Sequence, residues 1–283
     1  MAKPPRFPKF VTNSPTRRGV SIHPIALFFF VGAFLATASY AQTPPASPKP
    51  ALSPLERWRA TRIDVYMNNF AELSRYREAN AQLKPPAPGE KRVVFFGDSI
   101  TDGWLLTEYF PGKPYVNRGI SAQSTPQMLV RFQQDVVTLR PKAVVILAGT
   151  NDIAGNTGPM RLEDIEADFA SLAQLAKAND IKVVLSSILP VNNYTIQGED
   201  YSADRPDEKI LELNRWLSAY CREHGCVYLD YFHAMVDDKG KLKKELSDDG
   251  LHPNPAGYKV MAPLAEAAVT KALNHGHEAA SQP

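Results

Sequence analysis

A serine, a histidine and an aspartate in mutual contact can carry out acyl transfer, and this chain has candidates for all three. Ser99 follows the apolar run Val93–Phe96 through Gly97 and Asp98. Such a run is typical of a strand buried on both faces, and the glycine after it allows a tight turn. A serine in that position is either a nucleophile or an ordinary turn residue, and this stretch alone leaves both interpretations open.

Two of the histidines follow an aspartate by three positions, in the pairs Asp230–His233 and Asp249–His252. In either pair the carboxylate can meet Nδ1 of the imidazole while Nε2 faces outward, so spacing alone does not choose between them. A glycine and a Pro-Asn-Pro sequence place the second pair in a shaped loop before a helix, whereas aromatic and apolar residues surround His233. We therefore predict that Asp249 and His252 are the acid and the general base, and that His233 is a packed or surface residue.

Acyl transfer also needs hydrogen-bond donors for the negatively charged oxygen of the intermediate. Gly119 ends an expected strand and has no side chain to block its N–H. Asn151 follows Gly149 and Thr150 at the end of another strand, and its side-chain amide can donate. The alternative for Asn151 and Asp152 is an Asx turn.

Strands alternate with helical stretches along the chain, which predicts a parallel sheet covered by helices on both faces. Strands are expected over residues 92–96, 115–118, 143–148, 182–188 and 227–229, and helices over 55–83, 103–109, 125–139, 161–178, 205–223 and 255–273. The candidate site residues follow the ends of different strands. In such a sheet, the carboxyl ends of the strands meet at one edge, where ligands bind.

The first 41 residues differ from the rest of the chain. A basic segment without acidic residues precedes an apolar run over residues 25–38, and Ser39 and Ala41 form the small-x-small pattern of a cleavage site. We predict a signal peptide over residues 1–41, with Gln42 as the first mature residue, and an exported protein that is periplasmic or secreted. The alternative is an uncleaved anchor, although the run is short for a membrane-spanning helix. No stable membrane span is expected after cleavage.

The remaining chain is expected to form one domain. Residues 42–54 are rich in Pro, Ala and Ser and are interpreted as a linker. The domain covers residues 55–275 and begins with an amphipathic helix over 55–83, and residues 276–283 are expected to be a disordered tail. A net charge of +2 without basic runs argues against a nucleic-acid partner.

Cys221 and Cys226 flank the expected end of a helix. Their spacing is compatible with a disulfide in an exported protein, and equally with two small buried thiols. Two cysteines without other ligands do not indicate a zinc site. No glycine-rich phosphate loop follows the first strand, which argues against a cofactor-binding protein of the flavodoxin type.

Four sequence blocks resemble, in order and separation, those of the SGNH hydrolases, also called GDSL esterases or lipases. The blocks are Gly97-Asp98-Ser99, Asn117-Arg118-Gly119, Gly149-Thr150-Asn151-Asp152 and Asp249-Gly250-Leu251-His252-Pro253. The similarity extends over about residues 93–264 and is strongest to single-domain acylhydrolases that resemble the catalytic subunits of platelet-activating-factor acetylhydrolase.

The resemblance implies a flavodoxin-like three-layer α/β/α fold with a five-stranded parallel sheet. It implies that Ser99 is the nucleophile, that His252 is the general base and acid, and that Asp249 orients His252. It further implies an oxyanion hole formed by the N–H groups of Ser99 and Gly119 and the side chain of Asn151, with neither metal nor cofactor.

We therefore expect an exported serine esterase that cleaves a small-acyl ester, such as an O-acetyl group on a carbohydrate. Its partner would be a small-molecule or glycan ester. Trp104, Asn192 and Tyr194 are the expected substrate contacts, the last two because they lie in a long loop over residues 191–204. The alternatives are a lysophospholipase or thioesterase acting on lipids, and a non-catalytic carbohydrate-binding module on the same fold. The intact set of Ser99, Asp249 and His252 argues against the module.

Overall fold

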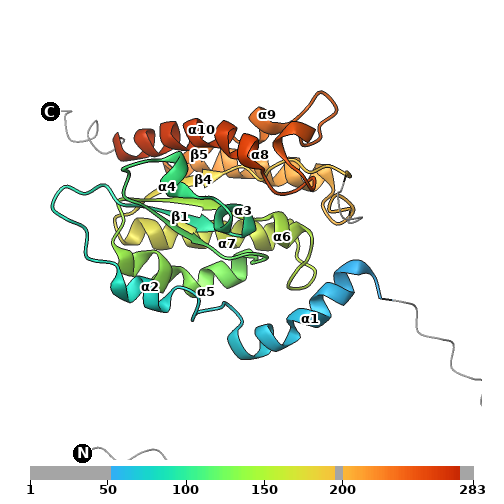
Figure 1. Ribbon diagram of the computed structural model, residues 1–283, viewed down its shortest axis with the longest axis horizontal. Coiled ribbons are helices and arrows are strands. Elements are labelled where there is room, and N and C mark those ends of the chain that lie inside the picture. Colours follow the sequence, from blue (N-terminus) through green and yellow to red (C-terminus); the bar gives the residue numbers. More distant parts are fainter. Residues whose placement is uncertain (1–51, 195–199, 275–283) are drawn as a thin grey trace, which may run out of the picture. The chain divides into compact units, whose positions relative to one another are not determined.

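The computed structural model describes residues 52–194 and 200–274. The predicted signal peptide, most of the predicted linker and the predicted tail lie outside the described residues. Five strands form one parallel sheet in the order β2-β1-β3-β4-β5 (Figure 1). They are β1 (Val93–Gly97), β2 (Tyr115–Gly119), β3 (Ala143–Leu147), β4 (Lys182–Ser186) and β5 (Val227–Leu229). The predicted five-stranded parallel sheet is therefore confirmed.

Successive side chains of the central strands enter two separate cores, because side chains alternate across a sheet. Val94 and Phe96 pack in one core, and Val93 and Phe95 pack in the other. Side chains of α5 (Thr125–Asp135), α7 (Leu162–Ala178) and α8 (Asp207–His224) complete the first core, and those of α10 (Pro255–Asn274) complete the second. Helices on both faces confirm the predicted three-layer α/β/α architecture.

Several strands end in a short helix at the carboxyl edge of the sheet. These are α3 (Ser99–Asp102) after β1, α6 (Thr150–Ile153) after β3 and α9 (Phe232–Met235) after β5. Three further short elements connect the layers, namely α4 (Leu106–Tyr109) and the 3₁₀ turns Val137–Leu139 and Lys244–Leu246. The short helices turn the chain immediately beyond the strand ends, so the polar residues of the sequence blocks remain at that edge.

The single helix predicted over residues 55–83 is wrong, because the structure has two helices there. They are α1 (Pro54–Asn69) and α2 (Arg77–Gln82). Between them, backbone carbonyls accept hydrogen bonds from glutamine side chains: Gln127 donates to Phe70 at 2.5 Å and Gln123 donates to Ala71 at 2.9 Å. These tertiary contacts outweigh the local helical pattern.

The outer face of α1 retains exposed apolar side chains. Ile63 and Met67 are 59% and 79% exposed, so the domain does not cover the whole apolar face that the sequence pattern predicts. None of the helices within residues 52–194 and 200–274 has the length and apolar character needed to span a bilayer.

The sequence left open whether Cys221 and Cys226 are bonded, and the structure joins them in a disulfide. The bond crosses the end of α8, where Gly225 has a φ of +70°. A left-handed residue at this position is a common way to end a helix, and glycine adopts it without steric cost.

Candidate active site

Ser99 lies where β1 turns into α3. Gly97 ends the strand, and a Cβ there would overlap Oγ1 of Thr101 on α3. Asp98 caps the helix, because its Oδ1 accepts a hydrogen bond from the N–H of Ile100 at 3.0 Å. The close approach and the cap together place Ser99 at the first position of α3, at the carboxyl edge of the sheet.

Three side chains form an unbroken hydrogen-bonded chain at this edge. Oγ of Ser99 lies 2.9 Å from Nε2 of His252, and Nδ1 of His252 lies 2.6 Å from Oδ2 of Asp249. Burial raises the pKa of Asp249, but hydrogen bonds from the side chain and backbone of His252 and from the N–H of Leu251 outweigh burial and lower the pKa below its usual value. An ionised Asp249 accepts a hydrogen bond from Nδ1–H of His252, and this tautomer has its Nε2 lone pair facing the serine hydroxyl.

The loop that carries Asp249 and His252 is fixed by its own backbone. Oδ1 of Asp249 accepts hydrogen bonds from the N–H groups of Leu251 at 2.9 Å and His252 at 2.8 Å. Gly250 between them has a φ of +82°, and a Cβ there would lie 2.6 Å from the carbonyl oxygen of Asn192. Glycine is therefore required both for the backbone conformation and for the close approach.

Two of the predicted substrate contacts, Trp104 and Asn192, are buried instead. Trp104 is 2% exposed and stacks on Tyr258 in the core. Asn192 is 6% exposed and donates from Nδ2 to the carbonyl of Leu242 at 2.7 Å. Burial thus contradicts the predicted role of both residues, since neither side chain is open to a substrate.

The third predicted contact, Tyr194, is half-buried and donates from its hydroxyl to the carbonyl of Ser247 at 3.0 Å. The N–H of Asn192 donates to the carbonyl of Gly250 at 2.8 Å. This part of the long loop therefore supports the segment that carries Asp249 and His252.

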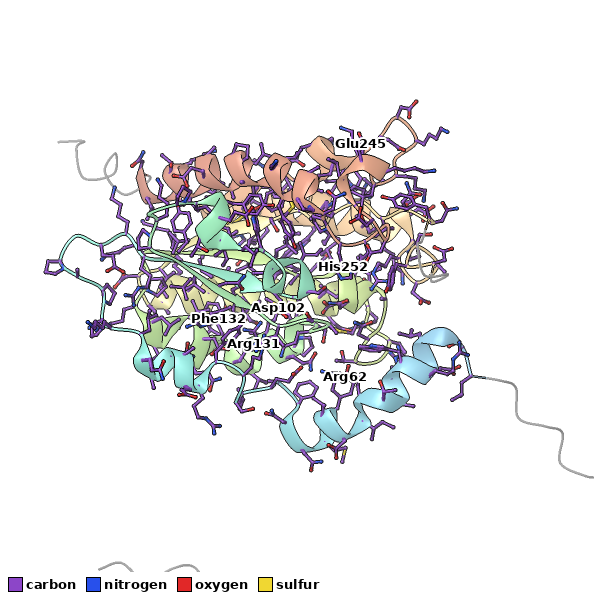
Figure 2. All side chains as sticks on the ribbon, viewed as in Figure 1. Arg62, Asp102, Arg131, Phe132, Glu245 and His252 are labelled. Atoms are coloured by element: carbon purple, nitrogen blue, oxygen red, sulfur yellow. A yellow bond between two sulfur atoms is a disulfide. The ribbon has the colours of Figure 1, made fainter. Side chains whose placement is uncertain are left out.

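An open depression surrounds the serine hydroxyl. It is lined by Ser99, Asp102, Gly103, Ser121, His252, Pro253 and Tyr258. Asp102 accepts hydrogen bonds from the N–H and the hydroxyl of Ser121 at 3.2 and 2.7 Å, and Arg75 approaches its other oxygen at 3.4 Å. Figure 2 labels Asp102 and His252, which lie near each other at this end of the sheet. The wall beside Ser99 is polar.

The structure does not leave Gly119 free as an oxyanion donor. Its N–H donates to Oδ1 of Asn117 at 2.8 Å. A Cβ at Gly119 would overlap the backbone of Asp102, so the glycine is explained by the contact between the end of β2 and α3. The sequence showed the glycine but not this competing acceptor.

Two other candidate donors follow the carboxyl ends of β2 and β3. Asn151 on α6 uses one amide proton to reach the carbonyl of Gln123 at 3.0 Å, and its second amide proton has no acceptor among the described residues. Ala122 has a φ of +67°, and within residues 52–194 and 200–274 neither its N–H nor that of Ser99 has an acceptor. Sequence reasoning missed Ala122, because a left-handed alanine has no signature in the sequence.

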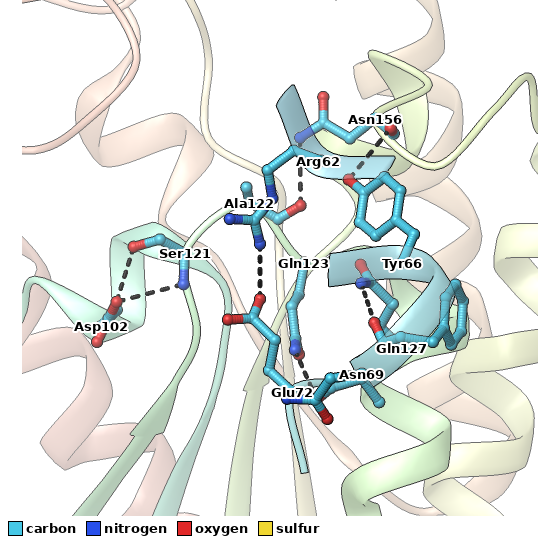
Figure 3. A network of polar contacts seen from close by, with 12 residues as sticks. Arg62, Tyr66, Asn69, Glu72, Asp102, Ser121, Ala122, Gln123, Gln127 and Asn156 are labelled. Atoms are coloured by element: carbon cyan, nitrogen blue, oxygen red, sulfur yellow. Dashed lines mark hydrogen bonds and ion pairs between the residues drawn. The ribbon is translucent and has the colours of Figure 1, made fainter. Parts of the chain in front are cut away.

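The loop that carries Ala122 is braced from the N-terminal side of the domain (Figure 3). Asn156 donates from Nδ2 to the carbonyl of Ala122 at 3.2 Å, and the hydroxyl of Tyr66 on α1 donates to the carbonyl of Asn156 at 3.4 Å. Gln123 reaches the carbonyl of Ala71, as described above. These side chains hold a loop that belongs to no regular element.

A buried arginine on α5 also supports the loop that carries Ala122. Arg131 on α5 has no exposed surface and lies over the ring of Phe96. Its guanidinium donates to the carbonyls of Gly97 and Arg118, both at 2.9 Å, and to Oε1 of Gln123 at 2.5 Å. One side chain therefore ties the ends of β1 and β2 to the loop.

Two buried carboxyl groups lie beneath the site. Burial raises the pKa of Asp98 to about 7, and Oδ2 of this residue has no hydrogen-bond partner among the described residues. Burial likewise raises the pKa of Asp152 to about 6, although its Oδ1 accepts hydrogen bonds from the N–H and hydroxyl of Thr125. Within the described ranges, no group of three or more His, Cys, Asp or Glu residues is placed to hold a metal ion.

The fold and the hydrogen-bonded chain of serine, histidine and aspartate have the arrangement of hydrolases of the Ser-His-Asp type on a parallel α/β sheet. Comparison with known families agrees: residues 95–260 match the GDSL-like lipase/acylhydrolase family. The chain belongs to this family, which confirms the predicted resemblance, and by class it is a carboxylic ester hydrolase.

The chain is similar to proteins of known sequence and structure. A GDSL-like lipase from Bacteroides thetaiotaomicron is 40% identical with a TM-score of 0.66, over 72% of this chain and 100% of that one. An acetylxylan esterase of Xylanibacter ruminicola is 29% identical over 65% of this chain, and the match spans 44% of its own length, less than half. An acetylxylan esterase of Geobacillus stearothermophilus is 25% identical over 62% of this chain and 91% of that protein.

Proposed function

We propose that this protein is an exported serine esterase that removes small acyl groups, and in particular O-acetyl groups on carbohydrates, through an acyl-enzyme. The observation that carries the proposal is the hydrogen-bonded chain from Oγ of Ser99 through His252 to Asp249. A serine hydroxyl is a weak nucleophile by itself, and a neutral imidazole at 2.9 Å can accept its proton as the hydroxyl attacks.

The reaction has two halves. Oγ of Ser99 attacks the ester carbonyl while its proton passes to Nε2 of His252, and Asp249 stabilises the imidazolium. The tetrahedral intermediate expels the alcohol, which takes the proton from Nε2, and leaves the acyl group on Ser99. A water molecule then gives its proton to Nε2 and attacks the acyl-enzyme, and collapse of the second intermediate releases the acid and returns the proton to Oγ.

The negatively charged oxygen needs donors that are already in place. We assign this role to the N–H groups of Ser99 and Ala122 and to Nδ2 of Asn151. Each has a proton without an acceptor among the described residues, and the loops that carry them are fixed by the contacts described above. Loss of one such donor typically lowers kcat by about 10²- to 10³-fold.

The substrate class rests on two kinds of support. Two relatives are acetylxylan esterases, and the depression beside Ser99 carries the carboxylate and hydroxyl of Asp102 and Ser121, which suit a hydroxyl-rich alcohol better than an acyl chain. Export is supported by the sequence pattern over residues 1–41, and mass spectrometry of the exported protein would test whether the mature chain begins at Gln42.

The test compares the wild-type domain with Ser99→Ala and, as a matched control, Ser171→Ala, whose hydroxyl contacts the carbonyl of Ala167 within α7. With p-nitrophenyl acetate, Ser99→Ala should lose activity by at least about 10⁴-fold and Ser171→Ala should retain it. Equal rates for all three proteins would refute the nucleophile. A panel of acetylated xylooligosaccharides, longer acyl esters and lysophospholipids then tests the substrate. A preference for lysophospholipids would overturn the carbohydrate assignment and leave the mechanism intact.

A further inference from the structure

Arg205 occupies an unusual position behind the oxyanion donors. It lies just before α8 and is 6% exposed. Its Nε donates to Oγ1 of Thr150 at 3.0 Å, and its Nη2 approaches Oδ1 of Asn151 at 3.5 Å. The same guanidinium therefore contacts two consecutive residues of the short helix α6, one of which carries a proposed oxyanion donor.

No carboxylate pairs with this buried cation among the described residues, since none lies within 4.0 Å of its nitrogen atoms. Burial lowers the pKa of Arg205, while the nearby charges of Asp204 and Asp98 oppose that effect. Burying a charge without a partner lowers the stability of the folded state, and arginine stays protonated despite burial. The site thus contains a positive charge that no ion pair within residues 52–194 and 200–274 neutralises.

The contacts with Arg205 and with the carbonyl of Gln123 agree on which way the amide of Asn151 faces. An arginine side chain has only donors, so the atom of Asn151 that faces it must be the oxygen. The amide nitrogen then faces the other way, where it donates to the carbonyl of Gln123. If the amide were reversed, its oxygen would face the developing negative charge and repel it.

We propose that Arg205 is a positioning residue for the oxyanion hole: it holds the oxygen of Asn151 so that Nδ2 faces the reacting ester, and its charge favours the negative oxygen of the intermediate. This inference rests on the proposed function. It adds a residue from a different segment of the chain, outside the four sequence blocks.

Arg205 also contacts the histidine side of the site through Tyr201. Nη1 of Arg205 donates to the carbonyl of Tyr201 at 3.0 Å, and the ring of Tyr201 meets the ring of His252 edge-on with centroids 6.1 Å apart. Loss of Arg205 could therefore act through His252 and not through Asn151. The experiment must separate these two routes.

A double-mutant cycle on p-nitrophenyl acetate makes that separation, using Arg205→Met, Asn151→Ala and the double variant. We expect Arg205→Met to lower kcat by about 10- to 100-fold with KM little changed. In the Asn151→Ala background the same substitution should lower kcat by a factor at least about threefold smaller, because the amide that it positions is gone and only the effect of the charge remains. An equal loss in both backgrounds, or an effect confined to KM, would overturn the proposal.

Arg92→Met is the matched control for removing a buried arginine. Arg92 is 5% exposed and donates to the carbonyls of Leu139 and Lys84, at the end of β1 opposite Ser99. We expect this variant to lower the melting temperature and leave kcat unchanged. A loss of kcat similar to that of Arg205→Met would show a general effect of core disruption and overturn the proposal.

Two conservative variants separate orientation from charge and serve if Arg205→Met does not fold. Arg205→Lys keeps a cationic donor, and Arg205→Gln keeps a neutral donor; we expect the lysine variant to retain more kcat than the glutamine variant. Wild-type kcat in Arg205→Gln would overturn the proposal. Ser99→Ala separates a failure of the proposed esterase function from a failure of the proposed role of Arg205. If Ser99→Ala remains active, the proposed function fails. If Ser99→Ala is inactive and the Arg205 variants keep wild-type kcat, only the role of Arg205 is refuted.

Discussion

Within the described part of the chain, two aspartate-histidine pairs have the same local geometry, Asp249–His252 and Asp230–His233. In both pairs Oδ2 of the aspartate lies 2.6 Å from Nδ1 of the histidine. In both, Oδ1 accepts the backbone N–H of the histidine, at 2.8 Å in the first pair and 3.1 Å in the second. A carboxylate three positions before a histidine therefore forms this contact from local backbone geometry alone.

The pairs differ in their surroundings. The side chain of His252 is 36% exposed and its Nε2 faces the hydroxyl of Ser99, whereas the side chain of His233 is 78% exposed. Oδ1 of Asp249 also accepts the N–H of Leu251. The aspartate-histidine contact is therefore a local structure that can form without an active site. Only Asp249–His252, among the two pairs, also contacts a serine from a distant segment, and this makes it the active-site candidate.

The largest expected effect comes from removing each histidine in turn. His252→Ala should lower kcat/KM for p-nitrophenyl acetate by about 10⁵-fold, because no other base among the described residues contacts the hydroxyl of Ser99. His233→Ala should change it by less than about twofold, as expected for an exposed side chain. The reverse result would identify His233 as the general base and contradict the assignment of His252.

Replacing each aspartate by asparagine tests which of the two orients the histidine that acts as the general base. Asp249→Asn should lower kcat by about 10³- to 10⁴-fold, because an amide can donate to Nδ1 and so favour the wrong tautomer of His252. Asp230→Asn changes the same kind of contact on the surface, and kcat should stay within about twofold. Steady-state kinetics of the two variants would contradict the assignment if the losses were similar.

A substitution at Gly250 should distort the loop that carries Asp249 and His252. Gly250→Ala should lower kcat by about 10- to 100-fold, because its Cβ would push against the carbonyl of Asn192 and displace His252. Gly240→Ala is matched, since Gly240 has a φ of +79° but nothing within 4 Å of an added Cβ. It should cost about 1 kcal/mol of stability and leave kcat unchanged. Equal kinetic effects would show that a strained alanine lowers kcat at either position, and that the contact with Asn192 is not the cause.

The smallest expected effect is on how stability depends on pH. Asp98, next to Ser99, and Asp249, next to His252, should change this dependence in opposite directions. Burial raises the folded-state pKa of Asp98 to about 7, above about 3.9 in the unfolded chain. The folded state therefore binds this proton more tightly, and wild-type stability falls as pH rises from about 4 to 7. Asp98→Asn does not titrate, so its melting temperature relative to wild type should rise over the same range.

Asp249 should show the opposite sign. Despite its partial burial, its hydrogen bonds lower the folded-state pKa, so it stabilises the protein at neutral pH, and this stability is lost as pH falls below about 4. The deficit of Asp249→Asn relative to wild type should therefore shrink in acid. Thermal melts of both variants from pH 3 to 8 that run parallel to the wild-type curve would contradict these assignments.

Much of the fold was predictable because its signals are local. The apolar run before Gly97 and those of the other strands determine the sheet, and each polar block follows the carboxyl end of a strand, so the meeting of Ser99 with His252 follows from the parallel topology. The choice of His252 over His233 relied on a glycine and two prolines near it, which shape the loop in the structure as well.

The remainder depends on contacts between distant segments. Nothing in the sequence near Gly119 shows that Asn117 takes its N–H, and nothing near Trp104 shows that the core encloses it. The break between α1 and α2 arises because Gln123 and Gln127 take backbone carbonyls there. Nothing in the sequence near Arg205 predicts its proposed role, because that role depends on the contact of its guanidinium with Asn151.

The brace on the Ala122 loop has a consequence for where this domain begins. The residues that match the family start at 95, yet Tyr66 and the carbonyl of Ala71 lie before that point and hold the loop through Asn156 and Gln123. A gene fragment trimmed to the family boundary would encode all of Ser99, Asp249 and His252 and still lack Tyr66 and Ala71, which hold the loop of Ala122. We therefore expect activity to require α1, which begins some forty residues upstream of the family boundary.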